Sequence, residues 1–291
     1  MPSPDRPSAW TRGFHPAHDG APTLVCFPYA GGSASFFHPL SAALSPHTRT
    51  LALQYPGRQE RHSEPGITDL DELVSRISAE LLPLTEPGRS PVVFFGHSMG
   101  ALLAFEVAER LELVSGTPID HLILSGRRPP SRAYPRNQWR LTDDQLLAEV
   151  AALHGTTRAA LDDPDLRAMF LPALRADYTA LAGHTPSPNA VVGCPLTVLT
   201  GDRDPLFPVE DAGSWAEHTG AGAEVHVLPG GHFYLTDHAN EVTRLIADRV
   251  PRPPLRSAVP RPRHGGPRHA ADARPSTPAP QPPAAQDPGA R

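Results

Sequence analysis

The pentapeptide Gly96-His97-Ser98-Met99-Gly100 decides the fold of this chain. It follows the apolar run PVVFF of residues 91–95 and opens the mostly apolar run ALLAFEVA of residues 101–108. A strand, the pattern G-x-S-x-G and a helix, in that order, are the context of a nucleophile elbow. The turn is so tight that both flanking positions must be glycine, and the serine takes a strained conformation with positive φ. We therefore predict that Ser98 is a nucleophile, placed where a helix N-terminus stabilises an oxyanion.

A nucleophilic serine needs a base, and the base needs an acid that orients it. In this architecture the three follow in the chain order Ser, Asp, His. The apolar run of residues 196–200 leads to Asp204, and the run of residues 223–228 leads to His232. Both candidates come just beyond predicted strands, on the rim where open α/β sheets place their sites. We predict a triad of Ser98, Asp204 and His232.

Four other residues compete for these roles. Asp202 directly follows a glycine and favours a turn, whereas at Asp204 the chain has already passed over the sheet edge. His97 is next to the serine, but the elbow directs neighbouring side chains apart, so we expect local packing or hydrogen bonding. His226 lies inside a predicted strand and His238 starts the last predicted helix, so both are expected to be structural.

The loop after the first core strand supplies the rest of the predicted site. Residues 23–27 form an apolar strand that ends in Pro28-Tyr29-Ala30-Gly31-Gly32-Ser33. Small residues let backbone N–H groups approach a ligand closely. In this fold the second oxyanion donor comes from such a loop, so we assign the two donors to the N–H groups of Ala30 and Met99.

Short apolar strands alternate with helices over much of the chain. Further strands are predicted at residues 51–54 and 119–125, and a helix is predicted from about Asp69. One face of that helix carries Leu70, Leu73, Val74, Ile77 and Leu81. This alternation predicts an α/β fold with a mostly parallel sheet covered on both faces.

The alternation stops between about residues 129 and 194. Residues 142–145 (TDDQ) match a capping box, and apolar side chains follow at Leu146, Leu147, Val150 and Leu153. A second helical stretch carries Leu166, Met169, Phe170, Leu174, Tyr178 and Leu181, with Pro172 expected to break or kink it. We interpret this insertion as a helical lid that encloses an apolar substrate tunnel. The same stripes also fit ordinary helices that face the core.

Composition sets the domain boundaries. The 291 residues include 37 prolines and are only 39% hydrophobic, because residues 251–291 are rich in Pro, Arg, Ala and Gly. Such a segment buries too little surface to offset its ordering entropy, so we predict a disordered tail. Its arginines also fit an anion-binding arm, although a solubilising tail is the simpler interpretation. Residues 1–20 are polar and irregular, which leaves residues 21–250 as one domain.

Charge and motif content narrow the partners. A net charge of −5 gives no general argument for nucleic-acid binding. No apolar run approaches membrane-spanning length and the N-terminus lacks a signal core, so we expect a cytoplasmic monomer. The 15 histidines form no H-E-x-x-H or Cys/His cluster, and neither a metal nor a cofactor is predicted. Cys26 and Cys194 are expected to be buried small hydrophobes.

Several further strings give the chain a family resemblance over about residues 10–250. Besides the elbow, they are FPYAGG at 27–32, YPGR at 55–58 with Arg61 and Glu64-Pro65, SGRR at 125–128, LPALRADY at 171–178, GDRDP at 201–205 and GHF at 231–233. With these the chain resembles the stand-alone type II thioesterases of polyketide and nonribosomal peptide assembly lines, within the α/β-hydrolase superfamily. The elbow alone is typical only of the superfamily. The tail is not part of the resemblance.

The resemblance implies roles and a substrate. Ser98 would be the nucleophile, His232 the base and Asp204 its orienter. The substrate would be an acyl group on the phosphopantetheine arm of a carrier protein, so that the arm belongs to the substrate and no cofactor is needed. An esterase of free small molecules, or an acyltransferase with an acceptor other than water, would share every catalytic residue.

A run of arginines suggests how a carrier protein would be held. Arg127, Arg128, Arg132, Arg136 and Arg140 occur without an acidic residue between them, where a core strand meets the predicted lid. Carrier proteins are typically acidic and their arm has a phosphate, so the arginines are hypothesised to steer and dock the substrate. A solvated loop or a brace for the lid is the alternative interpretation.

Overall fold

In the computed structural model, which describes residues 8–132, 140–154 and 164–251, seven strands form one sheet. The strand order is β1-β3-β2-β4-β5-β6-β7. β1 pairs with β3 in antiparallel fashion, and all other neighbours are parallel. The strands are β1 (Thr11–Arg12), β2 (Thr23–Phe27), β3 (Arg49–Leu53), β4 (Val92–His97), β5 (His121–Ser125), β6 (Leu196–Gly201) and β7 (Ala223–Leu228). The predicted, mostly parallel sheet is confirmed.

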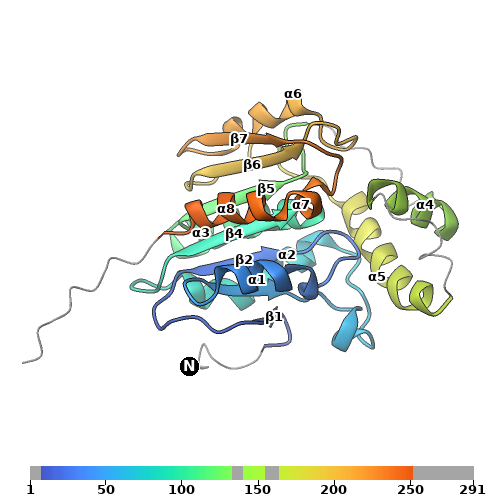
Figure 1. Ribbon diagram of the computed structural model, residues 1–291, viewed down its shortest axis with the longest axis horizontal. Helices are drawn as coiled ribbons and strands as arrows, with labels where there is room; N and C mark the ends of the chain where they lie inside the picture. The colour runs from blue at the N-terminus through green and yellow to red at the C-terminus, as the bar shows by residue number, and fades with distance from the viewer. Residues whose placement is uncertain (1–7, 133–139, 155–163, 252–291) are drawn as a thin grey trace, which may run out of the picture. The chain divides into compact units, whose positions relative to one another are not determined.

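Helices cover both faces of this sheet. Figure 1 has α1 and α8 in front of the sheet and α2 and α3 behind it. The helices are α1 (His38–Leu44), α2 (Leu70–Leu81), α3 (Met99–Ser115), α4 (Asp143–His154), α5 (Pro164–Gly183), α6 (Val209–Ala212), α7 (Tyr234–Asp237) and α8 (Ala239–Arg249). Short 3₁₀ turns lie at Ala34–Phe37, Gln59–Arg61, Leu82–Thr85 and Gly213–His218.

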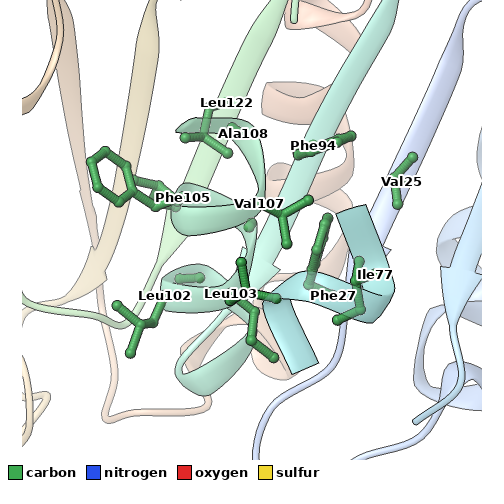
Figure 2. Close-up of a cluster of buried hydrophobic side chains, with 14 of the residues drawn as sticks. Val25, Phe27, Ile77, Phe94, Leu102, Leu103, Phe105, Val107, Ala108 and Leu122 are labelled. Atoms are coloured by element: carbon green, nitrogen blue, oxygen red, sulfur yellow. The ribbon is translucent and has the colours of Figure 1, made fainter. Parts of the chain in front are cut away.

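The central strands are apolar on both sides because both of their faces are buried. In β2, Val25 and Phe27 pack toward α2 and α3, whereas Leu24 and Cys26 pack toward α1 and α8. Figure 2 shows the first of these layers, in which Phe105 and other α3 side chains meet the sheet. A helix with so many buried residues is held rigidly, and it therefore fixes the position of Ser98 at its N-terminus.

Local signals start two helices where the sequence predicts them. The Asp69 side chain accepts a hydrogen bond from the Glu72 N–H at 3.1 Å and caps α2. At α4 the Thr142 N–H donates to Gln145 Oε1 at 2.9 Å, and the Gln145 N–H donates to Thr142 Oγ1 at 3.3 Å. This reciprocal pair is the predicted capping box.

Two local expectations were wrong. The N-terminal segment is not irregular throughout, because β1 adds an antiparallel edge strand next to β3. These two residues form a strand because they pair with β3, which is distant in the sequence, so no local pattern predicts the strand. Pro172 does not break α5, which runs without interruption over its full length, and the alternative of a kink at Pro172 stays a prediction. The proline is exposed, and residues on both sides of it are anchored by packing.

The insertion forms the helix pair α4 and α5. Leu146, Leu147 and Val150 of α4 pack with Leu174 of α5 in a small separate core. Figure 1 places both helices beyond the carboxyl ends of the parallel strands, where the predicted site lies. No described helix combines the length and the apolar character needed to cross a bilayer. Residues 252–291, the bulk of the predicted tail, lie outside the described residues.

Candidate active site

Ser98 has the backbone geometry of a nucleophile elbow. It is the N-cap of α3 with φ 54° and ψ −116°, one of the described non-glycine residues with positive φ. Its N–H donates to the Ser125 carbonyl on the neighbouring strand at 2.8 Å, which anchors the turn to the sheet. Strain of this kind persists only where the surrounding structure enforces it.

The two glycines of the elbow are required by close backbone contacts. A Cβ atom on Gly96 would lie 2.2 Å from the Gly100 carbonyl oxygen. A Cβ atom on Gly100 would lie 2.0 Å from the carbonyl oxygen of Phe27 in β2. Both distances are far below any van der Waals contact, and the crowding expected from the sequence is confirmed.

Asp204 and His232 meet at the same edge of the sheet. His232 Nδ1 lies 2.8 Å from Asp204 Oδ2, and both side chains are buried. The other carboxylate oxygen of Asp204 accepts hydrogen bonds from the N–H groups of Leu206 at 2.8 Å and Phe207 at 3.3 Å. These bonds fix the carboxylate, which in turn fixes the orientation of the imidazole ring and directs Nε2 away from the acid.

Asp202 has a different role. Its Oδ1 accepts the Gly230 N–H at 2.7 Å, and 48% of its side chain is exposed. It therefore ties the end of β6 to the turn that follows β7. The structure brings Asp204, and not Asp202, to the histidine.

A buried polar layer supports the His232 ring. His97 Nδ1 lies 2.9 Å from Ser125 Oγ, which lies 2.6 Å from the Tyr234 hydroxyl. The His97 ring centroid is 4.8 Å from that of His232. Gly126 has φ 64°, and a Cβ atom there would come within 2.7 Å of the His97 ring. The local packing predicted for His97 is confirmed.

The two predicted oxyanion donors remain available. Met99 is the first residue of α3, and Ala30 follows Tyr29 in the loop after β2. Among the hydrogen bonds of the described residues, none is donated by the N–H of Ala30 or Met99. Free N–H groups beside a nucleophile are what a developing oxyanion requires.

Ser98 and His232 lie on the wall of one cavity of about 450 Å³. In the described structure no hydrogen bond joins the Ser98 hydroxyl to the His232 ring, and such bonds commonly tighten only when substrate binds. Part of the apolar wall comes from α3 and from the helix pair α4 and α5. It includes Leu102, Val150, Leu153, Tyr178 and Leu181. The insertion therefore encloses the site as a lid.

The arginine run is only partly at the cavity. Arg127, Arg128 and Arg132 contribute to its wall, whereas Arg140 is exposed and Arg136 lies outside the described residues. Arg127 is buried. Acidic side chains already face the other two: Arg128 Nε lies 3.0 Å from Asp211, and Arg132 Nη2 lies 3.6 Å from Glu217. Docking by these arginines stays a prediction, with Arg132 the most accessible of the three.

The sequence did not predict two further polar links between the lid and the body. Arg58 and Asp177 form a buried ion pair at 2.7 Å between the loop after β3 and helix α5. At the end of α5, His184 lies between Asp71 at 3.1 Å and Glu106 at 2.5 Å. The partners come from distant parts of the chain, so no spacing predicts either link. Arg58 and Asp177 do lie within the strings YPGR and LPALRADY that carry the family resemblance, which is the one signal that points to them.

The Asp71, Glu106 and His184 group is also a candidate metal-ligand set, with ligand atoms within 4.8 Å of one another. The two carboxylates approach opposite ring nitrogens of His184. A metal ion on one nitrogen would therefore face only one of the carboxylates. This geometry suits a hydrogen-bonded tether of the lid better than a metal site.

Both cysteines are buried, as expected. Burial raises the pKa of the Cys194 thiol to about 12, so it remains protonated. Burial raises the pKa of Cys26 as well. Neither thiol has the electropositive surroundings of a nucleophile.

The fold and this geometry define an α/β-hydrolase with a serine at a nucleophile elbow. A family model described as thioesterase domain matches residues 22–250. A probable cadicidin biosynthesis thioesterase of Streptomyces griseus is 48% identical over 246 residues, which are 84% of this chain and 67% of that protein. Thioesterase PikA5 of Streptomyces venezuelae is 43% identical over 241 residues, covering 83% of this chain and 85% of that protein.

Solved structures agree with this assignment. The type II thioesterase BorB from the borrelidin biosynthetic cluster matches with a TM-score of 0.77 and 40% identity, covering 84% of this chain and 99% of BorB. This chain belongs to the thioesterase family. It is a hydrolase that acts on thioesters.

Proposed function

We propose that this chain is a stand-alone editing thioesterase that removes acyl groups from the phosphopantetheine arm of carrier proteins in a polyketide or nonribosomal peptide synthase. The observation that carries the proposal is the alignment with 99% of BorB, a type II thioesterase. A match over the full length of such an enzyme, at 40% identity, favours the same class of substrate. We infer that it works as a cytoplasmic monomer.

In the first half of the proposed reaction, Ser98 Oγ attacks the thioester carbonyl carbon while His232 Nε2 takes the hydroxyl proton. The carbonyl oxygen becomes an oxyanion and accepts the N–H groups of Ala30 and Met99. Collapse of this tetrahedral intermediate breaks the carbon–sulfur bond. The thiolate of the arm takes the proton from His232 and leaves an acyl-serine.

In the second half, water attacks the acyl-serine and gives its proton to His232. A second tetrahedral intermediate forms at the same donors. Its collapse releases the carboxylic acid and returns the proton to Ser98. Asp204 stabilises the imidazolium in both halves by accepting the bond from Nδ1.

A thioester suits this site. The leaving thiol has a pKa of about 8.5, so it departs more readily than an alkoxide or an amine and needs less help from the acid. The apolar side chains of the cavity fit an acyl chain, and a volume of about 450 Å³ accommodates a medium-sized one. Of the arginines on its wall, Arg132 is the most exposed, and it is the one proposed to attract the phosphate of the arm.

The proposal is tested by incubating the enzyme with a panel of acylated carrier proteins and following each by intact-protein mass spectrometry. We expect loss of the acyl mass from the carrier protein and release of the free acid. The same acyl group on a small thiol and on an oxygen ester is the control. Equal or faster turnover of the oxygen ester would contradict the proposed substrate, and transfer of the acyl group to an added acceptor would make the protein an acyltransferase.

A further inference from the structure

Helix α5 contributes a buried charge that faces the loop carrying Ala30. Arg58 Nη2 and Asp177 Oδ1 are 2.7 Å apart, and their side chains are only 5% and 2% exposed. Removing two charges from water is costly, and the attraction between them seldom exceeds that cost by much. The stability of the fold alone therefore does not account for an ion pair that is buried this deeply.

Both members of the pair bind the backbone of the oxyanion loop, which we define as residues 29–32. The second oxygen of Asp177 accepts the Gly31 N–H at 2.7 Å. Arg58 Nη1 donates to the Gly32 carbonyl at 3.3 Å. The two contacts fix the Ala30–Gly31 and Gly32–Ser33 peptide groups, on the C-terminal side of Ala30.

Side chains of α5 also pack against this loop. Gly31 has φ 74°, and a Cβ atom there would lie 2.8 Å from the Phe170 ring and 3.0 Å from Leu174. The loop thus meets α5 through one polar and one apolar contact, both at Gly31. The position of the helix and the path of the loop depend on each other.

The electrostatics support a role in positioning. Burial raises the pKa of Asp177, although Arg58 opposes the shift. A carboxylate at a position that disfavours its charge adds little to stability, which favours a positioning role for the pair over a stabilising one. The Arg58 guanidinium also lies over the Tyr55 ring, 5.0 Å from its centroid, which limits its movement.

We propose that Asp177 and Arg58 are positioning residues, through which lid helix α5 aims the Ala30 N–H at the oxyanion. The proposal rests on the oxyanion role assigned above to Ala30, and it deepens the proposed mechanism. If the loop were displaced, the enzyme would stabilise the transition state less, while the acyl cavity would stay in place. The expected loss is therefore in kcat, with KM little changed.

The test compares two double variants that leave no buried charge unpaired. Arg58→Met with Asp177→Leu removes the acceptor of the Gly31 N–H, whereas Arg58→Met with Asp177→Asn keeps an amide oxygen there. The matched control is Asp143→Asn. Asp143 lies on α4, and the substitution breaks its exposed ion pair with Arg175, which lies on α5 as Asp177 does. Each variant is assayed with an acyl-N-acetylcysteamine thioester, and its rate is normalised to the folded fraction from circular dichroism.

A second readout reports on the oxyanion itself. An acyl trifluoromethyl ketone forms a serine adduct with an oxyanion, and its Ki is measured for every variant. We expect the Leu variant to lose roughly 10- to 100-fold in kcat and to bind the ketone more weakly by a similar factor. KM should stay within about threefold, the Asn variant should recover most of the loss, and the control should match wild type.

Three results would overturn the proposal: unchanged kcat and Ki with only a lower melting temperature, a raised KM at constant kcat, or a lower kcat with unchanged Ki. If the Leu variant does not fold, Arg58→Met with Asp177→Ala decides, because it also removes the acceptor of the Gly31 N–H without leaving a buried charge unpaired. Unchanged kcat and Ki in that variant would again contradict the positioning role. The substrate contains no carrier protein. If the enzyme turns out not to act on carrier proteins, the kcat, KM and Ki of each variant relative to wild type are therefore unaffected. That outcome is thus distinguishable from a failure of the positioning role.

Discussion

The sheet edge and the lid build the two sides of this site in different ways. At the sheet edge, Ser98 and Asp204 each follow closely on a buried parallel strand, and His232 follows the parallel edge strand β7. The lid, by contrast, reaches the site through side chains of α4 and α5, and its links to the body join residues far apart in the sequence. Figure 1 shows both regions meeting at the carboxyl ends of the strands.

From this difference we infer that the sheet edge carries the reacting groups, while the lid side chains around the cavity determine which acyl groups are accepted. The groups proposed to make and break bonds are fixed by short stretches of backbone next to a rigid core. The groups that shape the acyl cavity depend on packing between helices, which varies more easily without loss of the fold. Changes to the proposed triad at the sheet edge should therefore abolish turnover, while changes to the lid side chains that line the cavity should alter which acyl group is accepted.

The largest effect is expected at the elbow. Ser98→Ala removes the nucleophile and should lower kcat by roughly 10³- to 10⁶-fold on every thioester tested. Steady-state hydrolysis of a small acyl thioester measures it, with circular dichroism to verify folding. An alanine variant with more than a few per cent of wild-type activity would contradict the assignment.

The next effect separates the two aspartates of the β6 turn. Asp204→Asn should cost roughly 10²- to 10⁴-fold in kcat, because the amide favours the wrong tautomer of His232 and removes the compensating charge. Asp202→Asn is the matched control, since the Asp202 carboxylate accepts a hydrogen bond from the Gly230 N–H and lies near Arg203, away from His232. Its kcat should stay within about threefold of wild type. Equal losses in the two variants would reverse the assignment.

The same contrast explains how much could be predicted from the sequence. The sequence predicts the strand at residues 223–228 with the bounds that the structure has. It also favours Asp204 over Asp202, because the strand that ends at Gly201, the turn and the acid are adjacent in the chain. The ion pair of Arg58 with Asp177 spans 119 positions, and the bond of Ser125 with Tyr234 spans 109. No periodicity or spacing reports such contacts, since only the folded sheet brings the partners together.

Within the lid, cavity size should control the acyl chain. Leu181→Phe adds volume to the wall, so kcat/KM for long acyl thioesters should fall roughly tenfold while short ones are unaffected. The control is Met169→Phe on the same helix, because that side chain is 66% exposed. A chain-length series assayed with both variants measures the effect. Parallel losses for short and long chains would point to disturbed lid packing instead.

The smallest effect is expected at the arginines. Arg132→Ala should raise KM for an acylated carrier protein a fewfold, more at low salt, and leave a small acyl thioester unchanged. The side chain is 43% exposed and already shares Asp211 and Glu217, which limits the size of the effect. Arg244→Ala, at an exposed position on α8, is the control. Equal KM values for all three proteins would leave Arg132 without a docking role.

The central claim is that one serine, held at the elbow between β4 and α3, does the chemistry. Labelling with a serine-directed fluorophosphonate, followed by peptide mapping, tests it most directly. The account predicts one label per molecule on the peptide that contains Ser98, and none in Ser98→Ala. A label on any other residue, or equal labelling of the alanine variant, would contradict it.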